Sequence, residues 1–402
     1  MRIQHLCMWT FAHVFKSVKR RVFSFICIIC VFIIIIKWRI TCTNVHPRLH
    51  LQHICSNYAK GVSVGNLCQS LCHTDGVPSL SCHSFYMEKE AVFSGTWMNK
   101  SVVFKALKKS PDTKELMQLS TVNQKNYPSE EEFSKLIQKN IKNKFNISIN
   151  DVDAWRMSYI PNQVGGIERN VEMDNVWLLL QDNEYLALLL YEKYVIFPKL
   201  LGSCGSMYAV QKLDSISGYW HLMTLYDSQE EWEKRIKLSL MILDYLLSLE
   251  KKLPEPLHIC DVKMNHFGVT SDTKKIMYLD LDSVHPRTIV DKMTGDGSEC
   301  KQHSDCDFLD CRSFCNLITY KCEYGVVNNN LQIVCERIFL GWVMSGRVMV
   351  PGLLLGPRTP RVLIELLELC ANPAGESGMS RAPATKEIRK RLYNLLINLK
   401  LS

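Results

Sequence analysis

The spacing of apolar residues predicts a chain that contains both helices and strands. Between positions 229 and 251 apolar side chains recur every three or four residues, from Trp232 to Leu247, which is the pattern of an amphipathic helix. Residues 91–107 instead place apolar, β-branched and aromatic side chains on both sides of a polar turn at Asn99, which predicts a β-hairpin. These two patterns indicate a mixed α+β fold.

Further segments extend the pattern on both sides of the long helix. We expect helices at 112–120, at 129–142 with Ser129 as the cap, over one long apolar stretch at 174–193, and from Thr385 onward, and short strands at 195–200, 206–212, 266–270 and 275–281. The apolar segment 338–355 is interrupted by Arg347 and Pro351. We therefore expect a buried helix and turn there, and not a membrane span.

The most continuous apolar run lies near the N-terminus. Residues 22–36 carry no charge, and basic residues flank them on both sides. Because no small-x-small cleavage site follows, a signal-anchor transmembrane helix at 22–40 explains the run better than a cleaved signal peptide, which stays as the alternative. The positive-inside rule then places residues 1–21 in the cytosol and the chain from about 41 onward in a lumen. An Arg20–Arg21 pair in the cytosolic part is compatible with retention in the endoplasmic reticulum.

The distribution of charge argues against a nucleic-acid partner. The chain has 48 Lys and Arg residues against 40 Asp and Glu residues, a formal charge of +8. Seven of the basic residues and no acidic residue lie in the first 40 positions, so the remainder is close to neutral. A neutral body lacks the basic surface that binds a phosphate backbone. The hydrophobic fraction of 47% is ordinary for a folded globular chain.

Cysteine use fits an oxidising compartment, because 14 of the 17 cysteines follow residue 41. The residues expected in disulfides fall into an early and a late group: Cys55, Cys68, Cys72 and Cys82, then Cys300, Cys306, Cys311, Cys315, Cys322 and Cys335. Zinc is the alternative, but neither group has the CxxC spacing of usual zinc modules. Two sequons, at Asn99 and Asn146, would be available for glycosylation in the same compartment.

The strongest chemical signal lies between His258 and Asp282. Asp261 and Lys263 are two residues apart in a loop after a long helix, and Asp280 follows a strand, a turn and a second strand. Phosphoryl transfer needs such a set. Asp261 would accept the proton of a substrate hydroxyl, Lys263 would offset charge on the moving phosphoryl group, and Asp280 would hold a metal ion on the nucleotide phosphates.

Two upstream residues complete a nucleotide site. Lys105 ends a predicted strand and could reach the α- and β-phosphates, and Glu184 lies on an apolar helix where a buried carboxylate needs a partner. We expect Glu184 to fix Lys105 by an ion pair. An ordinary charged strand end remains the alternative for Lys105. Because Asp280 and Asp282 would alternate along a strand, we expect only one of them to face the site.

The order of these residues resembles that of a protein kinase, and more specifically the divergent protein kinase domain 1 family, cysteine-rich type II membrane proteins of the endoplasmic reticulum. The resemblance is carried by the segments 95–97, 102–105, 182–185, 197–205, 260–263, 279–282 and 327–336. It implies a single-pass type II anchor in the endoplasmic reticulum membrane and a two-lobed, kinase-like lumenal domain. It also implies ATP with Mg²⁺ or Mn²⁺ as cofactor.

The resemblance divides the chain into a cytosolic segment and anchor (1–21 and 22–40), a Cys-rich lumenal stalk (41–90), an N-lobe-like region (91–215) and a C-lobe-like region (216–402) with the cysteine cluster at 300–335. An inserted helix-loop-helix occupies about 112–175 of the N-lobe-like region. In the family this insert binds calcium. The candidate loop, 161–172, keeps a central Gly and Glu172 at its twelfth place, but Pro161, Gln163 and Gly165 replace the oxygen ligands, so we expect no calcium.

Three departures from the kinase pattern bear on activity. His266 stands where a metal-binding Asn is expected, the turn at 93–101 offers only Gly95, and Asp282 replaces the Gly of the Asp-Phe-Gly element. His266 could also be a packed core histidine, and we do not assign it as a ligand. We therefore expect an atypical kinase that is weakly active or inactive. The alternative is a non-catalytic, disulfide-rich scaffold; in either case the protein substrate or partner is unknown.

Overall fold

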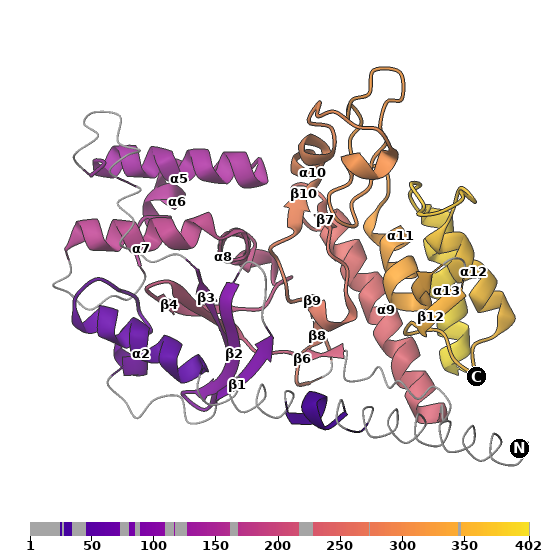
Figure 1. Cartoon of the computed structure of the whole chain (residues 1–402), viewed down its shortest axis with the longest axis horizontal. Helices are drawn as coiled ribbons and strands as arrows, with labels where there is room; N and C mark the ends of the chain where they lie inside the picture. The colour runs from indigo at the N-terminus through magenta and orange to yellow at the C-terminus, as the bar shows by residue number, and fades with distance from the viewer. Residues whose placement is uncertain are drawn as a thin grey trace, which may run out of the picture.

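Two lobes lie side by side in the computed structural model (Figure 1). The structure describes residues 46–72, 80–84, 89–108, 127–160, 168–216, 228–272, 274–344 and 347–401, with isolated positions at 25, 28–33 and 116. The smaller lobe is built on a five-stranded sheet, and the larger lobe is mostly helical. The fold is therefore the mixed α and β architecture that the sequence predicts.

The sheet of the smaller lobe is antiparallel and has the strand order β1-β2-β3-β5-β4. Its strands are β1 (Leu80–Ser84), β2 (Lys89–Trp97), β3 (Lys100–Leu107), β4 (Leu200–Cys204) and β5 (Met207–Gln211). The predicted hairpin at 91–107 is confirmed as β2 and β3. These strands meet at Met98 and Asn99, whose φ angles of +48° and +60° are those of a tight hairpin turn.

Alternation along β3 divides its side chains between the two faces of the sheet. Phe104 and its neighbours two residues away pack against α2 (His46–Ala59) and α3 (Cys68–Cys72), the helices of the Cys-rich segment. Leu107 belongs to the core on the opposite face, together with α8 (Asn183–Leu190). Lys105 has the same parity as Leu107, so the strand itself directs this lysine toward α8.

Helices α5 (Glu130–Phe145), α6 (Asp151–Met157) and α7 (Arg169–Gln181) form the insert between β3 and α8 (Figure 1). The helix predicted at 129–142 is confirmed as α5, and Ser129 forms a reciprocal capping box with Glu132. The helix predicted at 112–120 lies outside the described residues except for Leu116.

The single long helix predicted at 174–193 is wrong, because the chain breaks at Asp182. This residue has an extended conformation, with φ −77° and ψ 123°, and its carboxylate accepts a hydrogen bond from Tyr185 N–H at 2.8 Å. It therefore caps a new helix, α8. The apolar pattern of the segment is continuous. The Asp182 side chain nevertheless takes the Tyr185 N–H as its hydrogen-bond donor, which ends one helix and begins the next.

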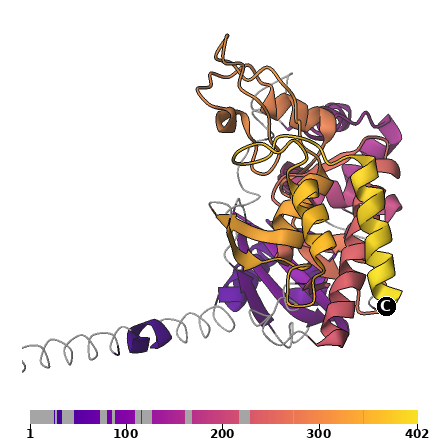
Figure 2. The ribbon, with the colours of Figure 1, turned by 90° about the vertical axis from the view of Figure 1, so that its right-hand side faces the viewer.

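The larger lobe is organised around α9 (Gln229–Lys251), which confirms the helix predicted at 229–251. Figure 2 shows α9 and α13 (Lys386–Leu401) running side by side, with α12 (Arg361–Ala371) packed against α13. Two small sheets lie beside α9: β7 (Leu257–Ile259) with β10 (Val284–Pro286), and β6 (Asp214–Ser215) with β8 (Phe267–Val269) and β9 (Ile276–Tyr278). The remaining elements are α10 (Arg287–Thr294), α11 (Asn330–Val334), the π-helical turn η7 (Cys335–Leu340) and the 3₁₀ turns η2 (Glu192–Tyr194), η5 (Met264–His266) and η6 (His303–Cys306).

Two further predictions of secondary structure are corrected. Most of segment 338–355 is a β-hairpin, β11 (Gly341–Met344) and β12 (Arg347–Pro351), and not a helix and turn. Gly341 has φ +101°, which ends the preceding helical turn, and the valines of both strands favour an extended chain. The strand predicted at 195–200 begins at Leu200 instead, because the 3₁₀ turn η2 precedes it.

Disulfide bonds, and not zinc, account for the described cysteines of both groups. Within the described residues the pairs are Cys55–Cys72, Cys68–Cys204, Cys260–Cys311, Cys300–Cys315, Cys306–Cys322 and Cys335–Cys370. Nine of the ten predicted residues take part. The side chain of the tenth, Cys82, lies outside the described part of the chain. The residue pattern did not predict that Cys204, Cys260 and Cys370 would pair with Cys68, Cys311 and Cys335.

The predicted anchor at 22–40 lies mostly outside the described residues. Among the residues that the structure does describe, none of the helices is both long and apolar enough to cross a membrane.

Candidate functional site

Lys105 and Glu184 form a buried ion pair between the sheet and α8. The Lys105 ammonium bonds to the Glu184 carboxylate and also donates to the carbonyl oxygen of Leu279 at 3.0 Å. The two side chains are only 11% and 2% exposed. Leu279 directly precedes Asp280, so this lysine joins the smaller lobe to the acidic segment of the larger one.

The residues at the start of α8 have separate tasks. Asp182 caps the helix and accepts a hydrogen bond from Tyr208 Oη at 3.1 Å. Asn183 donates from its amide nitrogen to the carbonyl oxygens of Leu281 and Asp282, at 3.1 and 3.2 Å. Since Glu184 follows directly, one helical turn holds both the lysine and the acidic segment. Sequence reasoning missed the role of Asn183, although it noted the surrounding motif.

Asp261 and Lys263 lie in the loop after β7, as the sequence predicts. Lys263 Nζ is 2.7 Å from Asp261 Oδ2, and the two side chains are 56% and 25% exposed. Unlike Lys105, this lysine is therefore able to leave its carboxylate and meet a ligand at the surface.

His266 is buried between Asp261 and Asp280. Its Nδ1 lies 3.1 Å from Tyr278 Oη and 3.3 Å from the carbonyl oxygen of Asp261, and its Nε2 lies 3.4 Å from Asp280 Oδ2. Burial lowers the pKa of His266, although the carboxylates of Asp280 and Asp261 oppose the change. The ring is thus neutral at neutral pH.

The contacts of His266 allow two positions for its proton. Burial raises the pKa of Tyr278, so its hydroxyl stays protonated, and it donates to the carbonyl oxygen of Asp261. With the His266 proton on Nδ1, the ring donates to the Tyr278 oxygen and Nε2 keeps a lone pair 3.4 Å from Asp280 Oδ2; with the proton on Nε2, the ring faces Asp280 as a donor. Only the first form can ligate a cation together with Asp280.

Asp280 is shared by two groups of possible metal ligands. The first is Asp261, His266 and Asp280, and the second is Glu184, Asp280 and Asp282; in each, one ligand atom per residue lies within 4.8 Å of the others. The expectation that only one of Asp280 and Asp282 faces the site is wrong, because residues two apart in an extended chain lie on the same side, and β9 in any case ends at Tyr278, before both aspartates. The donor set fits one divalent cation or two that share Asp280.

The sequence also failed to identify His266 as a member of this cluster. Its position, five residues after Asp261, was the available signal, because a metal-binding side chain is expected there in a kinase loop. An imidazole nitrogen is a softer donor than an amide oxygen, so the set is suited to a softer divalent ion than Mg²⁺.

The two sequon asparagines lie away from this cluster. Asn99 is exposed at the tip of the β2–β3 turn, and Asn146 ends α5 in a left-handed conformation with φ +53°. The Asn146 amide nitrogen donates to Thr288 Oγ1 at 3.0 Å, so of the two only Asn99 has a fully exposed position.

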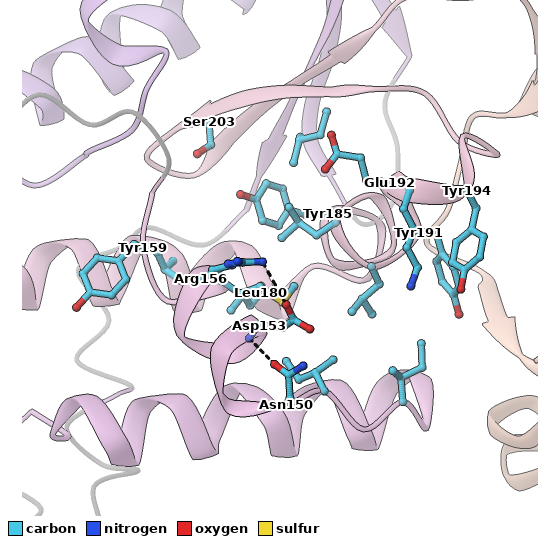
Figure 3. A pocket seen from close by; sticks show the side chains of 18 of the residues that line it. Asn150, Asp153, Arg156, Tyr159, Leu180, Tyr185, Tyr191, Glu192, Tyr194 and Ser203 are labelled. Atoms are coloured by element: carbon cyan, nitrogen blue, oxygen red, sulfur yellow. Dashed lines mark hydrogen bonds and ion pairs between the residues drawn. The ribbon is translucent and has the colours of Figure 1, made fainter. Parts of the chain in front are cut away.

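A hollow of about 1230 Å³ lies between the insert, α8 and β4 (Figure 3). Figure 3 shows Tyr185, Tyr191 and Tyr194 on one side of it and Asn150 and Asp153 on the other. Its described lining residues do not include Lys105, Asp261 or Asp280. The hollow is therefore separate from the acidic cluster.

A lysine-glutamate pair at the junction of two lobes, an Asp-x-Lys loop and a cluster of carboxylates define a protein-kinase-like domain. A family model described as the protein-kinase domain of FAM69 matches residues 176–373. A second, described as the N-terminal cysteine-rich ER region of FAM69, matches residues 15–156. The two matches together cover most of the chain, which belongs to the FAM69 family.

Proposed function

We propose that this protein binds a nucleoside triphosphate with a divalent cation at the cluster around Asp280 and transfers phosphate slowly, as an atypical kinase. The observation that carries the proposal is the convergence of Lys105, Glu184 and Asp280 with the loop that contains Asp261. Lys105 would contact the α- and β-phosphates while Glu184 holds it in place.

The cation would bind to Asp280 with His266, Asp282 or both, and would neutralise charge on the β- and γ-phosphates. The substrate hydroxyl oxygen would bond to the γ-phosphorus while Asp261 accepts the hydroxyl proton. The bond from the γ-phosphorus to the nucleoside diphosphate would break, and the diphosphate would leave. Lys263 would offset charge on the moving phosphoryl group. The missing glycines at 93–101 reduce backbone contacts to the phosphates, which is why slow transfer is expected.

The predicted anchor and the observed disulfides support a location for the domain. We propose a single-pass type II protein of the endoplasmic reticulum membrane, with residues 22–40 as the signal anchor and the kinase-like domain in the lumen. The six disulfides support an oxidising compartment, and the positive flanks of the anchor support this orientation. Asn99, exposed at a hairpin tip, is the favoured glycosylation site.

A non-catalytic scaffold is the second candidate, and one contact favours it. The turn that would cover the nucleotide is tied to the Cys-rich segment, because Trp97 Nε1 donates to Ser70 Oγ at 3.1 Å. A covering loop fixed in this way would restrict nucleotide entry. In a scaffold the lobes and disulfides would serve a protein partner.

One experiment separates the two functions. The full-length chain is tested for thermal stabilisation by ATP and for phosphate transfer, with Mg²⁺ and with Mn²⁺, beside Asp280→Ala. Asp272→Ala is the matched control, since Asp272 is an exposed carboxylate in the β8–β9 turn. We expect both signals in the wild type and the control, a larger signal with Mn²⁺, and neither signal in Asp280→Ala.

Other outcomes decide against the kinase. Stabilisation without transfer would assign the scaffold role to a nucleotide-binding pseudokinase. Absence of stabilisation with either cation would contradict nucleotide binding altogether, and equal loss in Asp272→Ala would show that the Asp280 effect is not specific.

A further inference from the structure

Asp310 and Cys311, two residues of the cysteine cluster, contact the residues directly before and after Asp261. Asp310 Oδ2 accepts a hydrogen bond from Val262 N–H at 2.8 Å, and Asp310 N–H donates to the carbonyl oxygen of Cys260 at 2.7 Å. The next residue, Cys311, forms a disulfide with Cys260. The residues before and after Asp261 are thus attached to one dipeptide.

Two other residues of the larger lobe bond to Asp310 in this dipeptide. Arg337 Nη2 donates to Asp310 Oδ1 at 3.2 Å, and Asn328 Nδ2 donates to the Asp310 carbonyl oxygen at 2.9 Å. The Asp310 side chain is 13% exposed. A buried carboxylate with an N–H donor on one oxygen and an arginine on the other has a fixed orientation.

We propose that Asp310 is a positioning residue for Asp261 and that the Cys260–Cys311 disulfide keeps it in place. The proposal rests on the proposed function, in which Asp261 is the base. Asp310 does not reach the substrate; it fixes the backbone on either side of the base. Cys260 and Cys311 are 0% and 3% exposed, so a reductant in the surrounding solution has little access to their bond.

The test uses Asp310→Ala and Asp310→Asn in the full-length chain. Asparagine keeps an acceptor for Val262 N–H, whereas alanine removes it. In Asp310→Ala we expect hydrogen exchange of residues 260–266 to accelerate and kcat to fall about a hundred-fold, with KM for ATP unchanged. Asp310→Asn should recover much of both. Asp296→Ala, an exposed carboxylate in the same region, is the control and should change neither.

Hydrogen exchange tests the positioning role of Asp310 without requiring that the protein transfers phosphate. If the wild type transfers no phosphate but Asp310→Ala accelerates exchange at 260–266, the positioning role stands and the kinase proposal fails. If exchange at 260–266 is unchanged in Asp310→Ala, the positioning role is wrong whatever the transfer activity. If alanine prevents folding, Arg337→Ala, which removes the guanidinium that orients Asp310 Oδ1, is compared instead and is expected to accelerate exchange at 260–266; unchanged exchange in that variant would contradict the positioning role.

A different observation concerns the insert. All five N–H groups of Arg169 have oxygen acceptors: both carboxylate oxygens of Glu130 at 2.7 and 2.8 Å, Glu172 Oε2 at 2.7 Å, and the carbonyl and hydroxyl oxygens of Ser158 at 2.9 and 3.3 Å. The guanidinium also lies 3.8 Å from the centre of the Tyr159 ring. Its hydrogen-bonding capacity is therefore completely used.

The contact between Arg169 and Glu172 bears on calcium binding. Glu172 occupies the twelfth place of the candidate loop, where a glutamate would bind calcium in a helix-loop-helix site. Its second oxygen, Oε1, accepts from Ile160 N–H at 2.9 Å. Both oxygens that would coordinate the ion are thus engaged within the chain. Within the described residues, Glu172 is therefore not available as the calcium ligand that the resemblance implies.

We infer that Arg169 supplies the positive charge that calcium supplies in a calcium-binding insert. It joins α5, through Glu130, to the segment after α6, through Ser158, and to α7, through Glu172. Because α7 leads directly into α8, the same cation fixes the insert beside the helix that carries Glu184. The position of Glu184 should then be independent of calcium.

Thermal unfolding of the full-length chain tests this inference. We expect the wild type to unfold at the same temperature with millimolar calcium and with a chelator, and Arg169→Ala to unfold several degrees lower. Arg156→Ala is the control, since Arg156 is 72% exposed and its pair with Asp153 spans 3.7 Å. In a double-mutant cycle, Glu172→Ala should cost less in the Arg169→Ala background than in the wild type.

Three results would overturn the inference: a rise in the unfolding temperature of the wild type with calcium, an Arg169→Ala variant as stable as the control, or additive effects in the cycle. If Arg169→Ala does not fold, Arg169→Lys, which keeps the charge but loses the planar fork, provides the cycle instead.

Discussion

Replacing Lys105 with Met is expected to destabilise the protein by about 3–5 kcal/mol and to remove its stabilisation by ATP. The ion pair with Glu184 is almost completely buried, so the substitution leaves a carboxylate in the interior without its cation. It also removes the contact between the ammonium and the carbonyl oxygen of Leu279, which joins the lobes beside Asp280. Urea unfolding measures the first effect and nucleotide-dependent thermal stabilisation the second.

A double substitution separates the contribution of this pair to stability from its contribution to ATP binding. In Lys105→Met/Glu184→Leu both charges are absent, and replacing a buried ion pair by apolar residues is often close to neutral for stability. We expect the double variant to recover most of the stability and none of the response to ATP. Lys263→Met is the stability control, and it should cost less than about 1 kcal/mol because its pair with Asp261 is exposed. A Lys105→Met variant as stable as this control, or a double variant that still responds to ATP, would refute the assignment.

Elements defined by nearby residues were predictable from the sequence. The helix α9 and the β2–β3 hairpin follow from the period of the apolar residues, which reports local geometry directly. The candidate site residues were named from short patterns, an Asp-x-Lys loop and a strand lysine, and were related to one another by their kinase-like order along the chain. Their roles stay predictions.

Errors arose where a polar contact competes with the apolar pattern. At Asp182 a side-chain cap interrupts a continuous apolar segment, and at Gly341 a positive φ ends a helical turn where the strand β11 begins. Neither change alters hydrophobic periodicity, so a method based on periodicity misses both.

Most contacts between distant positions could not be predicted, the Lys105–Glu184 pair excepted. The carboxylates of Asp280 and Asp282 lie close to Glu184, and Asn183, the residue before Glu184, bonds to the carbonyl oxygens of Leu281 and Asp282. The partner of Cys68 is Cys204, 136 residues away. Such pairs are set by the packing of the lobes and not by spacing, which is why Cys204, Cys260 and Cys370 were not predicted.

Removing the Cys68–Cys204 disulfide is expected to destabilise the protein by about 5 kcal/mol. The bond joins residues 136 positions apart, and a crosslink that closes a long loop restricts the unfolded chain more than one that closes a short loop. It also holds α3 against β4, so that the Cys-rich segment covers the face of the sheet opposite Lys105. Urea unfolding of Cys68→Ser/Cys204→Ser measures the effect, and hydrogen exchange of β2 and β3 shows whether that face opens.

Cys300→Ser/Cys315→Ser is the matched control. It also removes one disulfide, but the two cysteines are only 15 residues apart. Loop entropy predicts a cost of about 3 kcal/mol for it, so the long-range pair should be the more destabilising by about 2 kcal/mol. Equal costs would show that loop closure does not govern these bonds. Unchanged exchange in β2 and β3 after loss of Cys68–Cys204 would show that apolar packing alone keeps α2 and α3 on the sheet. The Cys-rich segment would then be an independent cover, and the disulfide would not hold the smaller lobe in the form that presents Lys105 to Glu184.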